Sequence, residues 1–140
     1  MAEFISKSSS QTEKIGSVLG KALKNGDVVA IFGDMGAGKT AFVRGLASGM
    51  GLNAFVSSPT FALVHEYPGN PPLFHFDMYR INSWDDLYST GFFDYMDIGG
   101  VIAVEWSENI ETALPENSIK VLITQGKLPN ERRIVITEDN

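Results

Sequence analysis

An eight-residue motif, Gly33-Asp34-Met35-Gly36-Ala37-Gly38-Lys39-Thr40, constrains the fold of this chain more than any other feature. It fits the pattern G-x-x-x-x-G-K-[ST], whose backbone N–H groups cradle the phosphates of a nucleotide. The apolar run 27–32 precedes the motif and is typical of a buried strand. Apolar residues at helical spacing follow it, namely Phe42, Val43, Leu46, Ala47 and Met50. The sequence therefore predicts a strand, a glycine loop and a helix within an α/β fold.

The residue types in this loop match what a triphosphate needs. The glycines at 33, 36 and 38 let the backbone approach the phosphates without a Cβ in the way. The loop N–H groups and the positive end of the helix then face the phosphates. Lys39 adds a point charge at the β- and γ-phosphates, and the Thr40 hydroxyl is placed to ligate Mg²⁺. We expect the cofactor-binding residues of this segment to be Gly33, Asp34, Met35, Gly36, Ala37, Gly38, Lys39, Thr40 and Ala41.

Composition narrows the class of protein. A chain of 140 residues, 44% hydrophobic and 20% charged, is expected to form one globular domain over residues 1–140. The net charge of −6 argues against a large nucleic-acid footprint, which needs clustered Lys and Arg. The absence of cysteine excludes disulfides, thiolate metal sites and a Cys nucleophile, and fits a cytoplasmic protein. We find no signal peptide in residues 1–14 and no apolar run of membrane-spanning length, so we expect no membrane contact.

The rest of the chain alternates between strand and helix signals. We expect a short strand at 3–6, then a helix that Ser8 to Ser10 cap and Asn25-Gly26 ends. Beyond the glycine loop and its helix, we expect a hairpin of 61–67 and 73–78 and a helix that begins at Ser83 and that Gly91 stops. A buried parallel strand at 101–104, a helix capped by Ser107 and a terminal hairpin of 119–124 and 134–137 complete the chain. These elements predict one compact domain.

Hydrolysis of a nucleotide also needs an acid near Mg²⁺ and a group that orients water. Glu105 follows the most buried-looking strand, and ligands of open α/β sheets bind beyond the carboxyl ends of strands. Asp77 ends an alternating strand on a face that it shares with His75, where it could hold a metal-bound water or act as a base. The pattern leaves open which acid is nearer the metal, and either could be a surface acid.

Three further positions carry weaker signals. Thr60 follows Pro59, which stiffens its loop, and it could sense the γ-phosphate as GTPase switch loops do or be a plain turn threonine. Tyr79 and Arg80 could contact phosphate or a partner, or simply be solvated. Trp106 could stack on a base or belong to the core.

Taken together, these motifs resemble a known family. Ser57-Ser58-Pro59-Thr60, His75-Phe76-Asp77-Met78-Tyr79-Arg80 and Val104-Glu105-Trp106, in this order behind the glycine loop, look like TsaE, formerly YjeE. The resemblance covers nearly the whole chain. It implies a small bacterial P-loop ATPase that is required for threonylcarbamoyladenosine formation at position 37 of tRNAs that read ANN codons. The implied fold is P-loop NTPase-like, with a mixed, mostly parallel sheet that carries helices on both faces and antiparallel hairpins.

The resemblance also implies roles for individual residues. ATP and Mg²⁺ would be the cofactors, with Thr40 and Glu105 as metal ligands. The catalytic residues would be Lys39, Asp77 and Glu105, of which Asp77 would be the acid that positions water. Thr60 would lie in a switch-I-like loop, 77–80 would form a switch-II-like segment, and Thr12 would lie by the adenine, with a contact near Arg132 or Arg133.

The resemblance implies partners as well. Family members work with the TsaD–TsaB heterodimer and do not transfer the threonylcarbamoyl group themselves. We therefore expect slow ATP hydrolysis that these partners stimulate. An acidic chain with four arginines is a poor tRNA binder, so tRNA contact would pass through the partners.

Three other functions compete with this one. A small P-loop metabolite kinase would need a lid, usually with arginines, and the chain has no insertion for one. A small GTPase would need an Asn-Lys-x-Asp element, which the sequence lacks. A non-catalytic ATP-sensing interaction module remains the strongest alternative.

Overall fold

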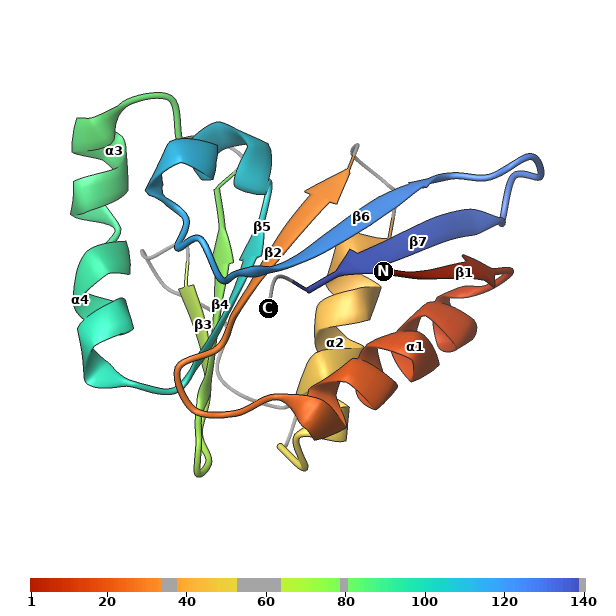
Figure 1. The fold of residues 1–140 in the computed structure, drawn as a ribbon, viewed down its shortest axis with the longest axis horizontal. Coiled ribbons are helices and arrows are strands. Elements are labelled where there is room, and N and C mark those ends of the chain that lie inside the picture. The colour runs from red at the N-terminus through yellow and green to blue at the C-terminus, as the bar shows by residue number, and fades with distance from the viewer. Residues whose placement is uncertain (34–37, 53–63, 79–80, 139–140) are drawn as a thin grey trace.

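The computed structural model describes residues 1–33, 38–52, 64–78 and 81–138 (Figure 1). Its strands form one seven-stranded sheet in the order β1-β7-β6-β2-β5-β4-β3. The strands are β1 (Ala2–Ser6), β2 (Val28–Gly33), β3 (Val64–Tyr67), β4 (Leu73–Asp77), β5 (Val101–Glu105), β6 (Ile119–Gln125) and β7 (Arg132–Thr137). The helices are α1 (Ser9–Ala22), α2 (Lys39–Gly49), α3 (Trp84–Ser89), α4 (Phe92–Ile98) and the 3₁₀ helix η1 (Ser107–Ala113).

The sheet is parallel in its centre and antiparallel at its edges. Strand β2 pairs in parallel with β5 and β6, and β5 pairs in parallel with β4. The pairs β1–β7, β6–β7 and β3–β4 are antiparallel. The mixed α/β sheet with antiparallel hairpins that the family resemblance implies is therefore confirmed, with three of its six strand pairs parallel rather than most of them. Because β2, β5 and β4 run the same way, their carboxyl ends meet at one edge of the sheet.

Both faces of the sheet are covered by helices, as expected. Alternate residues of each central strand point to opposite faces, so β2 sends Val29 and Ile31 to one side and Val28 to the other. The first side forms a core with Phe42 and Leu46 of α2. The second side forms a core with α3, α4 and η1 through Leu87, Phe92 and Ile110. Figure 1 shows α1 and α2 together on one side and α3 and α4 apart from them on the other.

Helices α1 and α2 approach each other closely because glycines line their contact. Gly16 and Gly20 lie one turn apart on α1, and Gly45 and Gly49 lie one turn apart on α2. A Cβ at any of these four positions would overlap the backbone of the other helix. At Gly45, for example, it would meet the carbonyl of Glu13. The two helices therefore pack backbone against backbone, which side chains of any size would prevent.

At the ends of the helices, one prediction is confirmed, one helix was not predicted and one cap is wrong. Gly91 follows the end of α3 with a left-handed φ of 79°, as expected of a glycine that stops a helix, but it also precedes α4, which the sequence did not predict. Ser107 does not cap the helix after β5, because it is the first residue of η1 and its hydroxyl donates to the Val104 carbonyl at 2.9 Å. Trp106 occupies the cap position with a φ of 59°.

Candidate functional site

The ends of β2, β5 and β4 bring Gly33, the first residue of the glycine-loop motif, and both candidate acids to one edge of the sheet. Glu105 lies opposite Ile31 of β2 on one side and opposite Asp77 of β4 on the other. Glu105 is therefore on the strand next to the loop, and Asp77 is one strand further out. Glu105 is 6% exposed, which is rare for a carboxylate, whereas Asp77 is exposed to solvent.

Buried Glu105 is held by two side chains from other elements. The Thr40 hydroxyl, at the start of α2, is 3.3 Å from Oε1 and 3.4 Å from Oε2 of Glu105. His75 Nε2, on β4, contacts Oε2 from the other side. A hydroxyl and a carboxylate are oxygen ligands of the kind that Mg²⁺ takes, and two oxygens bound side by side to one Mg²⁺ at about 2.1 Å lie roughly 3 Å apart. The spacing of Thr40 and Glu105 fits a shared magnesium ion.

Lys39 is held across the same edge of the sheet. Its side chain is 4% exposed, and Nζ donates to the Gly33 carbonyl at 2.5 Å. The same Nζ lies 3.4 Å from the centroid of the Trp106 ring, which is close enough for a cation–π interaction. Trp106 thus packs over the lysine that would meet the phosphates.

A pocket of about 300 Å³ opens on the α1 side of the loop. Gly38, whose φ is 96°, and Ala41 form its wall from the start of α2, and Thr12 and Arg132 line it from α1 and β7. Thr12 is buried, and its Oγ1 is 2.7 Å from Ser6 Oγ. The volume is at the lower end of the range for small-molecule sites. The structure therefore brings Thr12 together with Gly38 and Ala41, two of the residues that the sequence predicts to bind the cofactor.

Two residues of the site escaped the sequence reading. Glu108, in the first turn of η1, accepts a hydrogen bond at Oε2 from the Gly33 N–H at 2.8 Å. This bond joins η1 to the first residue of the glycine loop, and a charged acceptor makes it stronger than a neutral one. His75 entered the sequence analysis through its strand face and the family motif, without a role of its own, yet it is buried against Glu105. Neither contact has a sequence signal, because the partners are 75 and 30 residues apart.

The pKa values of two side chains on β3, His65 and Tyr67, are shifted by their surroundings. Burial lowers the pKa of His65 below its ordinary 6.5, and His75 adds to this effect, while Glu105 and Asp77 oppose it. The rings of His65 and His75 stack with centroids 5.4 Å apart. Burial likewise raises the pKa of Tyr67 above 10.0. The neutral form of His65 is therefore favoured next to the acids.

Several predicted site residues lie outside the described part of the chain: Asp34, Met35, Gly36, Ala37, Thr60, Tyr79 and Arg80. Within the described ranges, no group of three His, Cys, Asp or Glu residues is placed to hold a metal ion by itself. None of the helices over those ranges is both long enough and apolar enough to cross a membrane.

Comparisons with known proteins agree on one family. The family model "Threonylcarbamoyl adenosine biosynthesis protein TsaE" matches residues 6–134. The chain is 38% identical over 117 residues to the tRNA threonylcarbamoyladenosine biosynthesis protein TsaE of Treponema pallidum, covering 84% of this chain and 87% of the relative. It is 38% identical over 128 residues to the protein of the same name from Bacillus subtilis, covering 91% and 79%. The fold matches the crystal structure of Bacillus subtilis YdiB with a TM-score of 0.76 and 32% identity, over 99% of this chain and 86% of that one.

Proposed function

We propose that this chain, which belongs to the TsaE family of tRNA threonylcarbamoyladenosine biosynthesis, is a Mg²⁺-dependent ATPase that serves this modification. The observation that carries the proposal is the contact between Thr40, in the glycine-loop motif, and the buried carboxylate of Glu105. Burying a carboxylate is costly unless it is paired. The Thr40 hydroxyl and His75 Nε2 are the partners of Glu105 in this structure, and a bound Mg²⁺ would add a further partner for its charge at the carboxyl end of β5.

In the proposed hydrolysis, each residue around the glycine loop has a separate role. A bound Mg²⁺ would neutralise charge on the phosphate oxygens, and Thr40 and Glu105 would hold it. Lys39 would exchange the Gly33 carbonyl for a phosphate oxygen, which is the better acceptor because it is charged. Asp77, exposed and one strand away from the metal ligands, would orient the attacking water. As the water oxygen bonds to the γ-phosphorus and the bond to ADP breaks, Asp77 would take the proton of the water.

The pocket lined by Thr12 would hold the adenine. It lies beside Gly38 and Ala41, so a base there would be continuous with phosphates in the loop. Trp106, already packed on Lys39, would stay close to the phosphates rather than the base. The switch and partner roles of Thr60, Tyr79 and Arg80 remain part of the proposal, on the strength of the family resemblance alone.

The proposed partners are the TsaD and TsaB homologues of the same cell. The net charge of −6 supports tRNA contact through these partners rather than through this chain. A role in tRNA modification supports a cytoplasmic location, which is part of the proposal. We propose that the protein does not transfer the threonylcarbamoyl group, and that its ATP turnover acts on the partner complex.

Phosphate release with Mg²⁺-ATP tests the enzymatic part of this proposal. We expect slow release from the isolated protein, faster release with the TsaD–TsaB heterodimer, and loss of both in Lys39→Ala. Lys21→Ala, on the exposed face of α1, is a matched control that should behave as the wild type. Equal release from wild type and Lys39→Ala in the presence of the heterodimer would contradict the proposal. If the protein bound ATP but showed no phosphate release that depends on Lys39, it would be a nucleotide-sensing module instead.

A further inference from the structure

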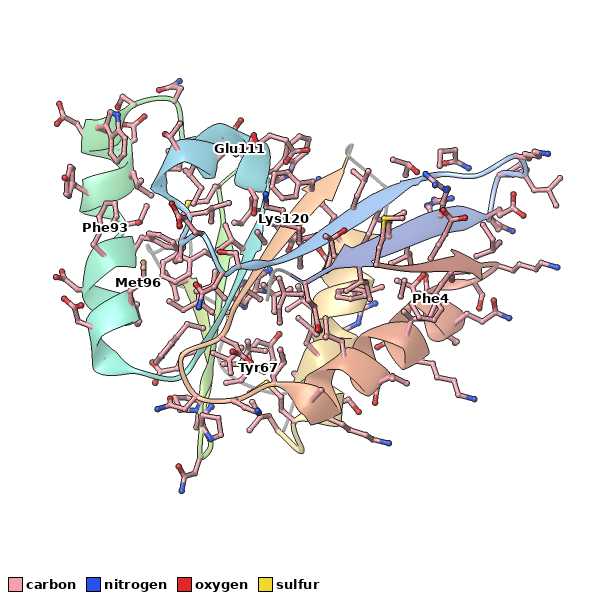
Figure 2. All side chains as sticks on the ribbon, in the orientation of Figure 1. Phe4, Tyr67, Phe93, Met96, Glu111 and Lys120 are labelled. Carbon is pink, nitrogen blue, oxygen red and sulfur yellow. The ribbon has the colours of Figure 1, made fainter. Side chains whose placement is uncertain are left out.

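Three aromatic rings form an exposed ridge on α3 and α4. This aromatic ridge consists of Trp84, Tyr88 and Phe93, and the first two side chains are 51% and 64% exposed. The ring centroids of Trp84 and Phe93 are 6.4 Å apart with nearly parallel planes, and those of Tyr88 and Phe93 are 5.1 Å apart. Figure 2 labels Phe93 on α4, at the side of the molecule away from Phe4 on β1. Contiguous exposed aromatic surface of this kind is typical of protein–protein contacts.

A recess adjoins the ridge. It has a volume of about 300 Å³ and lies between α3 and η1, with Trp84 and Leu87 on one wall and Asn109, Ile110 and Ala113 on the other. Trp84 therefore belongs to both the ridge and the recess. An apolar side chain that projects from a partner would find an apolar floor here and polar groups at the rim, which is the usual anatomy of an interface anchor.

The segment that carries the ridge is acidic. Residues 81–119 contain eight acidic residues and no Lys or Arg. Glu105 and Glu108 of this segment belong to the candidate active site, and the other six, none of them buried, are Asp85, Asp86, Asp94, Asp97, Glu111 and Glu116. All eleven basic residues of the chain lie outside this segment. Such a field repels nucleic acids and anionic membranes and attracts basic surfaces. The occupant that fits is a protein surface with Lys or Arg around an apolar anchor.

Hydrogen bonds connect the recess to the candidate active site. Asn109, in its wall, donates from Nδ2 to the backbone carbonyl of Met78 at 2.7 Å, directly after Asp77. Glu108, the preceding residue, accepts from the N–H of Gly33. A partner seated against η1 would therefore contact the element that touches both the strand end of Asp77 and the start of the glycine loop.

We propose that the aromatic ridge and its recess dock a basic surface of the TsaD–TsaB heterodimer, and that this contact couples the heterodimer to ATP turnover. The inference rests on the proposed function for the identity of the partner, and on the ridge, the recess and the charge for the place. A partner bound there reaches the nucleotide site through η1 without entering it.

Affinity measurements with the purified heterodimer test this surface. Tyr88→Ser and the double variant Trp84→Ser/Tyr88→Ser remove exposed rings, and Asp97→Lys reverses a charge one helical turn from Phe93. Matched controls are Val18→Ser on α1, also 64% exposed, and Glu138→Lys after β7. ATP affinity is measured for every variant, as a check that the fold and the nucleotide site are intact.

We expect the double variant to weaken heterodimer binding at least tenfold and Tyr88→Ser to weaken it several-fold, with ATP affinity unchanged. Asp97→Lys should weaken binding at low salt, and the difference should shrink at high salt because salt screens surface charges. The controls should stay within twofold of the wild type. A dimer of this chain that Tyr88→Ser dissociates, or tRNA binding that Asp97→Lys changes, would assign the ridge to another occupant and overturn the inference.

The two proposals fail in different ways. If the wild type binds the heterodimer and hydrolyses ATP faster with it, but the ridge variants bind equally well, the docking surface is wrong and the proposed function stands. If the wild type neither binds the heterodimer nor responds to it, the partner in the proposed function is wrong, and this docking inference falls with it.

Discussion

The hydroxyl of Thr40 lies 3.3 and 3.4 Å from the two carboxylate oxygens of Glu105, although the residues are 65 positions apart in the chain. Thr40 comes from α2 and Glu105 from the end of β5, and the parallel pairing of β2 with β5 brings them together. Asp77 pairs with Glu105 in register but one strand further from the loop. The sequence leaves the order of these two acids open, and the sheet order separates them.

Glu105→Gln should weaken the magnesium dependence of ATP binding. The amide is a poorer ligand for a hard cation than a carboxylate, so we expect the Mg²⁺ concentration at half-saturation to rise on the order of tenfold or more. Titration of ATP affinity against Mg²⁺ measures this. Glu111→Gln, an exposed acid on η1, serves as the control. An unchanged Mg²⁺ requirement in Glu105→Gln would remove this residue from the metal site.

Asp77→Asn should separate binding from turnover. The variant keeps the size of the side chain but loses the base, so we expect ATP affinity within about twofold of the wild type and a turnover rate roughly 10²–10⁴ lower. Nucleotide titration and single-turnover phosphate release measure the two quantities. Loss of ATP binding in this variant would make Asp77 a ligand for nucleotide or metal instead.

Glu108 should position the glycine loop through the Gly33 N–H. Glu108→Ala removes the acceptor and should weaken ATP binding roughly threefold to tenfold, the equivalent of one hydrogen bond of about 1 kcal/mol. Glu108→Gln keeps an oxygen acceptor and should recover most of the affinity. Comparable losses in both variants would show that the charge, and not the hydrogen bond, matters. Calorimetric titration with ATP distinguishes the two.

His65 should make the nucleotide-free protein less stable in mild acid. Because its pKa is lowered in the folded state, the unfolded chain binds more protons as the pH falls through the unfolded value of about 6.5. The free energy of unfolding therefore falls from pH 7.5 to pH 5.5. His65→Gln removes this contribution, so urea unfolding at both pH values should show a smaller loss than in the wild type. Identical losses in the two proteins would mean that His65 does not contribute to the pH dependence of the free energy of unfolding.

Local patterns predict the parts of the site that one segment builds. The glycine loop and the strands around it follow from residue types and spacing within about 25 residues, and the period of the apolar residues predicts both faces of the sheet. The α4 helix escaped because glycine ends helices more often than it begins them, and here Gly91 separates two helices. The cap at Trp106 escaped because a bulky residue rarely adopts positive φ.

Contacts between residues far apart in the chain define the rest of the site, and local sequence patterns do not predict such contacts. The Glu108–Gly33 hydrogen bond and the His75–Glu105 contact depend on strand order, which the sequence leaves undetermined. Thr12 reaches the pocket beside Gly38 only because α1 packs across α2. The family resemblance supplied Thr12, since its own neighbourhood carries no signal of a ligand.

The glycines between α1 and α2 have a consequence for the nucleotide. Thr12 stands on α1, whereas Gly38, Lys39 and Thr40 open α2, so the candidate base wall and phosphate cradle belong to separate helices. Direct backbone contact at the glycines sets the spacing between these two helices. An alanine at Gly20 or Gly49, two turns or more from any proposed ligand contact, would push the helices apart and misalign base and phosphate. Residues with no side chain thus set the distance between the two halves of the nucleotide site.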